Sequence, residues 1–140
     1  MEQLKACYEN YLAEADEVLK NRTPWDGVFG IGSPSKNHPC HIRFFRAVEA
    51  WVENFVNNDP NQQLAEEAVT YILEGAEPYK NKFPYWTLFA AHGLARPLIP
   101  YVSPEYAEKT LAWYKEHCPR RERLPVHKDL FKLLKKQARA

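Results

Sequence analysis

The densest group of potential metal ligands is His38-Pro39-Cys40-His41, where two imidazoles and a thiol fall within four residues. On a helix, His38 and His41 are three positions apart and share a face. A zinc site needs three or four ligands, yet the other cysteines and histidines are distant and no Cys-x-x-Cys or His-Glu-x-x-His spacing occurs. We therefore expect His41 to be a hydrogen-bonded core or cap histidine and Cys40 a partly buried thiol, with no metal or other cofactor.

A second pair with chemical potential is His92 and Arg96, four residues apart in the stretch 83–102, which is apolar almost all round. On an α-helix this spacing places both side chains on one face. They form either a cleft in which Arg96 binds an anion and His92 acts as a polar or acid–base group, or a buried structural pair. We favour the structural interpretation, in which a glutamate of a neighbouring helix neutralises Arg96 and His92 is hydrogen-bonded, because an unpaired buried charge is very costly.

No other pattern points to catalysis. The sequence contains no nucleophile beside a base, no paired-carboxylate motif and no glycine-rich phosphate loop, and Gly27, Gly30 and Gly32 do not have the dinucleotide-binding spacing. A non-enzymatic function is therefore expected. A domain or enzyme that uses His92 and Arg96 to bind a small ligand or anion is the alternative.

Aromatic residues make up 14% of the chain, and four of them are candidates for binding. Trp25 and Phe29 lie in a loop at 24–38 that is rich in glycine and proline, while Tyr106 and Trp113 lie beside the core-facing stripe of one predicted helix. Tyrosine and tryptophan are frequent hot-spot residues in protein interfaces, although a core that encloses these rings is the simpler explanation for each. The sequence favours an adaptor or binding module with a protein or peptide partner, which uses this aromatic helical face and the loop.

Apolar periodicity and the placement of prolines predict one all-α domain, residues 1–140, with about six helices. The helices are expected at 2–21, 39–57, 60–76, 83–102, 104–117 and 126–138. The stretch 83–102 is expected to be a central buried helix that is kinked or ended by Pro97. Asp59-Pro60 and Ser103-Pro104 are predicted to cap the helices that follow them.

The predicted helices also suggest a repeated unit. Residues 64–74 and 106–116 share small, acidic, aliphatic and aromatic positions at an offset of 42, and proline-bracketed connectors precede three helices. A period near 42 is typical of two-helix repeats of the HEAT or armadillo kind. Two arrangements remain open: a short array of helical pairs, or a compact six-helix bundle that uses the same helices.

Charge and composition narrow the class of protein. The net charge is +1, but residues 119–140, a basic linker and helix, carry +6 and the first 118 residues carry −5. A solvated helix face explains the basic end, and nucleic-acid binding through it ranks last because aromatic residues do not alternate with the basic ones. Three widely spaced cysteines, no signal-peptide core and no long uncharged apolar run predict a cytoplasmic protein without a membrane partner.

Overall fold

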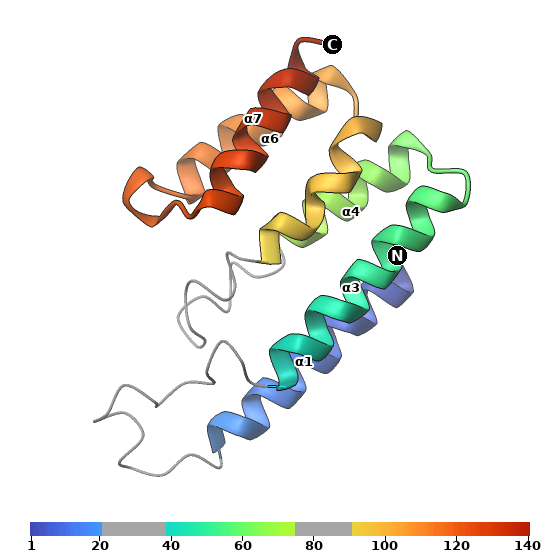
Figure 1. Cartoon of the computed structure of the whole chain (residues 1–140), viewed down its shortest axis with the longest axis vertical. Helices are drawn as coiled ribbons and strands as arrows, with labels where there is room; N and C mark the ends of the chain where they lie inside the picture. The colour runs from blue at the N-terminus through green and yellow to red at the C-terminus, as the bar shows by residue number, and fades with distance from the viewer. Residues whose placement is uncertain (21–38, 75–90) are drawn as a thin grey trace.

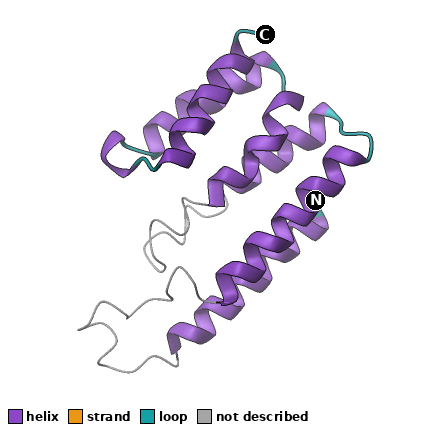
Figure 2. Ribbon diagram, in the orientation of Figure 1, coloured by secondary structure: helices purple, strands orange, loops and turns teal. Residues whose placement is uncertain are grey.

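The computed structural model describes residues 1–20, 39–74 and 91–140, which contain helices and no strands. These residues confirm the predicted all-α fold of about six helices (Figure 2). The helices are α1 (Glu2–Lys20), α3 (Pro39–Asn57), α4 (Gln62–Glu74), the 3-10 helix η2 (Ala91–Tyr101), α6 (Pro104–His117), the short 3-10 helix η3 (Arg120–Glu122) and α7 (Pro125–Ala138). The predicted loop 24–38, with Trp25, Phe29 and His38, lies outside the described residues, and so does the stretch 83–90.

The helices are arranged as three consecutive pairs in two layers. The main contacts join α1 to α3, α4 to η2, and α6 to α7, and η2 also packs against α3 and α7. In Figure 1, α3, η2 and α7 form the layer nearer the viewer, while α1, α4 and α6 lie behind it. Of the two arrangements that the sequence left open, the described helices adopt the array of pairs. The sequence repeat itself stays a prediction.

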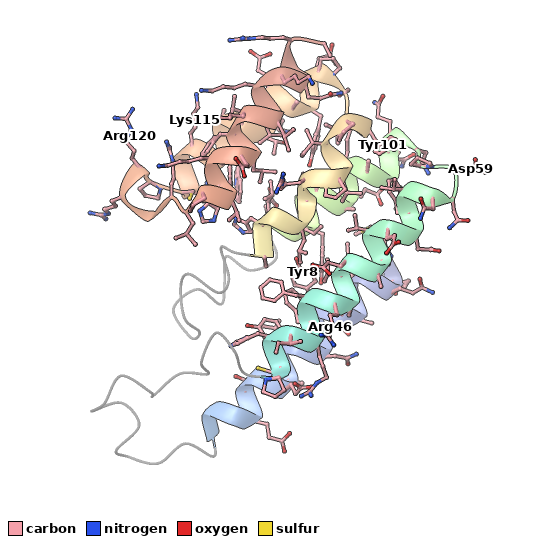
Figure 3. The ribbon with its side chains drawn as sticks, viewed as in Figure 1. Tyr8, Arg46, Asp59, Tyr101, Lys115 and Arg120 are labelled. Carbon is pink, nitrogen blue, oxygen red and sulfur yellow. The ribbon has the colours of Figure 1, made fainter. Side chains whose placement is uncertain are left out.

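Each helix buries one face between the layers and leaves a charged face outside. Residues spaced three and four apart, such as Leu4, Tyr8 and Tyr11 of α1, are almost fully buried. Figure 3 shows Tyr8 in the space between the first pair and the second, where its ring packs edge-on against Phe44 and Tyr71, each 4.9 Å away between ring centroids. Across the described residues, no helix combines the length and apolarity needed to cross a bilayer.

The centre of the front layer differs from the prediction. Residues 91–101 form a 3-10 helix that continues through Pro97 and Pro100, so the prediction of an α-helix interrupted at Pro97 was wrong for this part. Each proline lacks an amide donor, and its ring collides with the carbonyl four residues earlier in an α-helix. Long 3-10 helices are uncommon because their hydrogen bonds have poorer geometry. Packing against α3, α4 and α7 therefore stabilises η2.

The structure confirms one predicted cap and corrects the other. The Ser103 side chain accepts a hydrogen bond from the Tyr106 amide at 3.1 Å, as expected of an N-cap. Helix α4, however, begins at Gln62, and the cap is Asn61, whose Oδ1 accepts a bond from the Leu64 amide at 2.8 Å. Asp59 lies in the outer turn with φ of 51°, a left-handed conformation that glycine adopts without steric cost and that aspartate and asparagine tolerate better than most other residues (Figure 3).

These two turn positions give a direct test of the cap assignment. Asn61→Ala is expected to lower the free energy of unfolding by about 1 kcal/mol, because it removes the side-chain acceptor at the start of α4. Asp59→Gly is expected to leave stability unchanged or slightly raised, because glycine accepts positive φ without steric cost. Urea unfolding of both variants measures the difference. The opposite ranking would restore Asp59 as the cap.

Candidate binding groove

An open groove with a volume of about 580 Å³ crosses the outer face of the layer formed by α3, η2 and α7. Its apolar surface comes from all three helices: Val52 and Val56 of α3, Leu94 and Pro97 of η2, and Leu133 of α7. Val56, Leu94 and Leu133 are only partly buried, so they offer apolar area to solvent or to a ligand. We call this surface the front groove.

The front groove follows from the shape of its central helix. A 3-10 helix is more tightly wound than an α-helix and rises about 2.0 Å per residue, so η2 is thinner than its neighbours. Gly93 lines the groove without a side chain. A Cβ atom placed there would lie 3.5 Å from the Cβ of Val126 in α7, which shows how closely η2 and α7 approach. The two α-helices therefore form walls on either side of a recessed floor.

Three charged residues also line the front groove, and among the described residues none of them forms an ion pair. Glu49 and Glu53 are exposed on the α3 wall, and Arg96 is exposed on the floor. An ion pair joins Arg43 to Glu14, with Arg43 Nε 3.0 Å from Glu14 Oε1, outside the groove. The groove thus presents unpaired charges of both signs beside apolar area.

The two layers differ in charge as well. The helices of the front layer, α3, η2 and α7, carry seven Lys and Arg residues against three Asp and Glu residues. The helices behind, α1, α4 and α6, carry eleven acidic residues against four basic ones. The front layer therefore has a net positive charge and the rear layer a net negative charge, although the front groove itself is lined by two acidic residues and one basic residue.

The expectation that His92 and Arg96 share a face was wrong. His92 is 2% exposed, whereas Arg96 is exposed in the front groove and is not the buried, glutamate-paired arginine that we favoured. With three residues per turn, positions four apart in a 3-10 helix lie about a third of a turn apart. The sequence interpretation assumed 3.6 residues per turn. A role for Arg96 in binding an anion stays a prediction, but His92 does not accompany it.

His92 instead belongs to a buried cluster of polar rings. Its Nδ1 atom shares a hydrogen bond of 3.1 Å with the Tyr114 hydroxyl, and its ring centroid lies 5.9 Å from that of His127. Burial lowers the pKa of His92 to about 3, His127 acts in the same direction, and a backbone hydrogen bond to Leu73 opposes both. His92 is therefore neutral near pH 7 and reaches solvent only if the core opens.

His127 and His41 are both buried near the starts of their helices, α7 and α3, and each forms a hydrogen bond through its Nδ1 atom. The Leu124 amide donates to His127 Nδ1 at 2.8 Å, and this histidine is fully buried. His41 is also fully buried, and its Nδ1 atom is hydrogen-bonded to the Tyr11 hydroxyl at 3.0 Å. His41 is therefore a buried, hydrogen-bonded histidine, and its exclusion from a metal site stays a prediction.

Cys40 is 1% exposed, so its thiol lies deeper than the partly buried position that the sequence suggested. Its sulfur atom lies 3.7 Å from Nδ1 of the neighbouring His41. Burial is the largest cause that raises the pKa of this thiol, which favours its protonated form. Within the described ranges, no group of three or more His, Cys, Asp or Glu side chains could hold a metal ion.

Tyr106 and Trp113 lie on α6 in the rear layer, away from the front groove. The Tyr106 hydroxyl donates to the Glu66 carbonyl at 2.9 Å, and Trp113 stacks on His117 with ring centroids 4.3 Å apart. Both line a small cavity of about 140 Å³ between α4 and α6. Both side chains are partly buried by packing against their neighbours, and a binding role for either one stays a prediction.

Sequence reasoning missed the front groove because its residues are far apart along the chain. One signal for the histidine positions was present: Pro39-Cys-His-Ile-Arg-Phe-Phe and Pro125-Val-His-Lys-Asp-Leu-Phe share proline, histidine and a final phenylalanine at a spacing of 86 residues. The two segments open α3 and α7, and each places a buried histidine at the third position. No comparable signal marked Glu49, Glu53 or Leu133.

Comparisons of this chain with protein-family models, with curated proteins and with solved structures found no match.

Proposed function

We propose that this chain is a non-enzymatic protein-binding module and that the front groove is its docking surface for a segment of another protein. The observation that carries the proposal is the groove itself, about 580 Å³ in volume, with walls from α3 and α7 and a floor from η2. It combines exposed apolar area with charged residues on the α3 wall and on the floor, a mixture found in many protein interfaces.

The shape of the groove favours a macromolecular ligand over a small one. Sites for small molecules usually enclose most of the ligand surface. The front groove is open along the outer face of three helices, so a small ligand there would keep much of its surface in solvent. A protein segment lying along the groove can bury its own apolar side chains against Val56, Leu94 and Leu133 together.

The strongest chemical alternative uses His92, whose perturbed pKa is a common feature of functional sites. The perturbation here comes chiefly from burial in the core, and the side chain is 2% exposed. A substrate would have to displace core residues to reach it. The His92 cluster is therefore better explained as a polar element of the core than as an acid–base catalyst.

The proposal places the module in the cytoplasm. The three cysteines are widely spaced along the sequence, and all three are thiols in the structure. Buried thiols such as Cys118, which is fully buried in the core, are compatible with a reducing compartment.

Selection of displayed random peptides on the immobilised full chain tests the proposal. We expect Leu94→Glu to weaken binding of the selected peptides by about tenfold or more, because it places a charge in the apolar part of the groove. The matched control is Ile42→Glu, the same kind of change at an exposed aliphatic residue of α3 that does not line the groove. The control should keep wild-type affinity.

Two results would contradict the proposed function. One is the recovery of peptides that bind Leu94→Glu as tightly as the wild type, which would place the docking surface elsewhere. The other is a failure to enrich any peptide above the background of an unrelated helical protein. Circular dichroism melts of both variants confirm that each remains folded before affinities are compared.

A further inference from the structure

The dimensions and charges of the front groove indicate the shape and charge of its ligand. Adjacent packed helices lie about 8–10 Å apart, so the walls α3 and α7 are separated by about 16–20 Å with η2 recessed between them. An α-helix with its side chains is about 10–12 Å wide. A fourth helix can therefore lie above η2 and contact both walls, with its side chains packed between those of α3 and α7.

The charges of the α3 wall set a spacing that a helix can match. Glu49 and Glu53 are four residues apart and one turn apart on α3, so their Cβ atoms are about 5–6 Å from each other. Two basic residues four apart on a second helix have the same spacing. A helix lying along α3 can therefore pair both glutamates at once, which a single lysine cannot do.

The positive charge of the groove lies on its floor, and α7 carries a lysine near the groove. Arg96 lines the floor, and Lys136 is exposed one turn after the groove residue Leu133 on α7. Neither forms an ion pair within the part of the chain that the structure describes. An acidic side chain on the flank of the ligand that faces η2 and α7 can pair with Arg96, which lines the groove, and Lys136 adds positive charge farther along α7.

We propose that the front groove binds an amphipathic α-helix with an apolar stripe, two basic residues four apart on its α3-facing flank, and acidic residues on its α7-facing flank. This inference rests on the proposed function, because it names the class of segment that the docking surface takes. The apolar stripe supplies most of the affinity, and the charges fix the orientation and select the ligand.

Three synthetic peptides of about 18 residues, long enough to form a helix on binding, test the inference. The first carries the proposed pattern. The second replaces both basic residues by glutamate, so that neither direction of binding pairs the α3 wall, and the third has the composition of the first without an apolar stripe. We expect the first to bind the full-length wild type about tenfold more tightly than the second, and the third to show no binding. The preference should shrink at about 1 M NaCl, because salt screens exposed charges.

The variant Glu49→Lys/Glu53→Lys reverses the charges of the α3 wall at two exposed positions and leaves Arg96 in place. It is expected to prefer the second peptide over the first, with the melting temperature of the wild type. Glu49→Gln/Glu53→Gln serves as a milder variant that removes the preference without reversing it. A reversed preference in the Glu49→Lys/Glu53→Lys variant is a result that a purely structural role of these side chains does not produce.

Each contrary result has a distinct meaning. Equal affinity of the wild type for the first two peptides, with both lost in Leu94→Glu, would overturn the charge pattern and leave the proposed function standing. Binding of displayed peptides but not of any designed helix would overturn the helical ligand. Wild-type chains that form dimers in sedimentation experiments while Leu94→Glu stays monomeric would replace the amphipathic ligand with a second copy of this chain.

Discussion

Tyr114→Ala is expected to lower the free energy of unfolding by about 3–5 kcal/mol, the usual loss when a buried aromatic side chain is removed. Tyr114 is fully buried and packs on Phe131 with ring centroids 4.8 Å apart, and its hydroxyl is hydrogen-bonded to His92. The substitution therefore removes packing between α6 and α7 together with a polar contact to η2. Urea unfolding monitored by circular dichroism measures the loss.

Tyr114→Phe separates the two contributions. It keeps the packing but removes the hydroxyl bonded to His92, with an expected loss of about 1–3 kcal/mol. Tyr8→Phe is the matched control, because the Tyr8 hydroxyl is buried and has no hydrogen-bond partner within the described residues. Its removal should be neutral or stabilising. If Tyr8→Phe and Tyr114→Phe lowered the free energy of unfolding equally, the buried hydrogen bond to His92 would make no measurable contribution to stability.

Lowering the pH from about 7 to about 5 is expected to reduce the free energy of unfolding by about 2 kcal/mol through His92 alone. The pKa of this histidine is about 3 in the folded protein, against about 6.5 in the unfolded chain. Below pH 6.5 the unfolded state therefore binds a proton that the folded state does not. The stabilisation is complete above pH 6.5 and declines as the pH falls toward 3.

Urea unfolding at the two pH values measures this effect, and His92→Gln identifies its source. The variant is expected to be less stable than the wild type near pH 7 but to lose less stability on acidification, because glutamine does not titrate. Any remaining pH dependence belongs to other groups. An identical loss in wild type and variant would show that His92 does not carry the effect.

Much of the helical pattern could be read from the sequence, because it depends on local chemistry. The predicted helix at 104–117 agrees with α6 at both ends, since Ser103, Pro104 and the apolar spacing act within a few residues. The prediction at 39–57 agrees equally well with α3. The residues of 91–101 were assigned to the wrong type of helix, because an apolar stretch with two prolines does not distinguish a 3-10 helix from an interrupted α-helix.

The candidate site was harder to predict than the helices. Glu53, Leu94 and Leu133 belong to three different pairs, and they meet only because the pairs stack in order. That stacking depends on contacts between residues far apart along the chain, which periodicity does not encode. The same limit explains why Arg96 was placed wrongly. The sequence marked it as a candidate for binding an anion, but its exposure depends on the 3-10 winding of η2, which the sequence interpretation did not anticipate.

The prolines of η2 have a consequence for the mechanics of the protein. They remove two amide donors from the element that packs against α3, α4 and α7, so side-chain packing, rather than a regular backbone ladder, holds the middle of the array together. Amides of η2 should therefore exchange with solvent deuterium sooner than those of α6 or α7. The floor of the groove is then its most compliant part, and it can adjust to ligands of slightly different width at little cost in backbone hydrogen bonds.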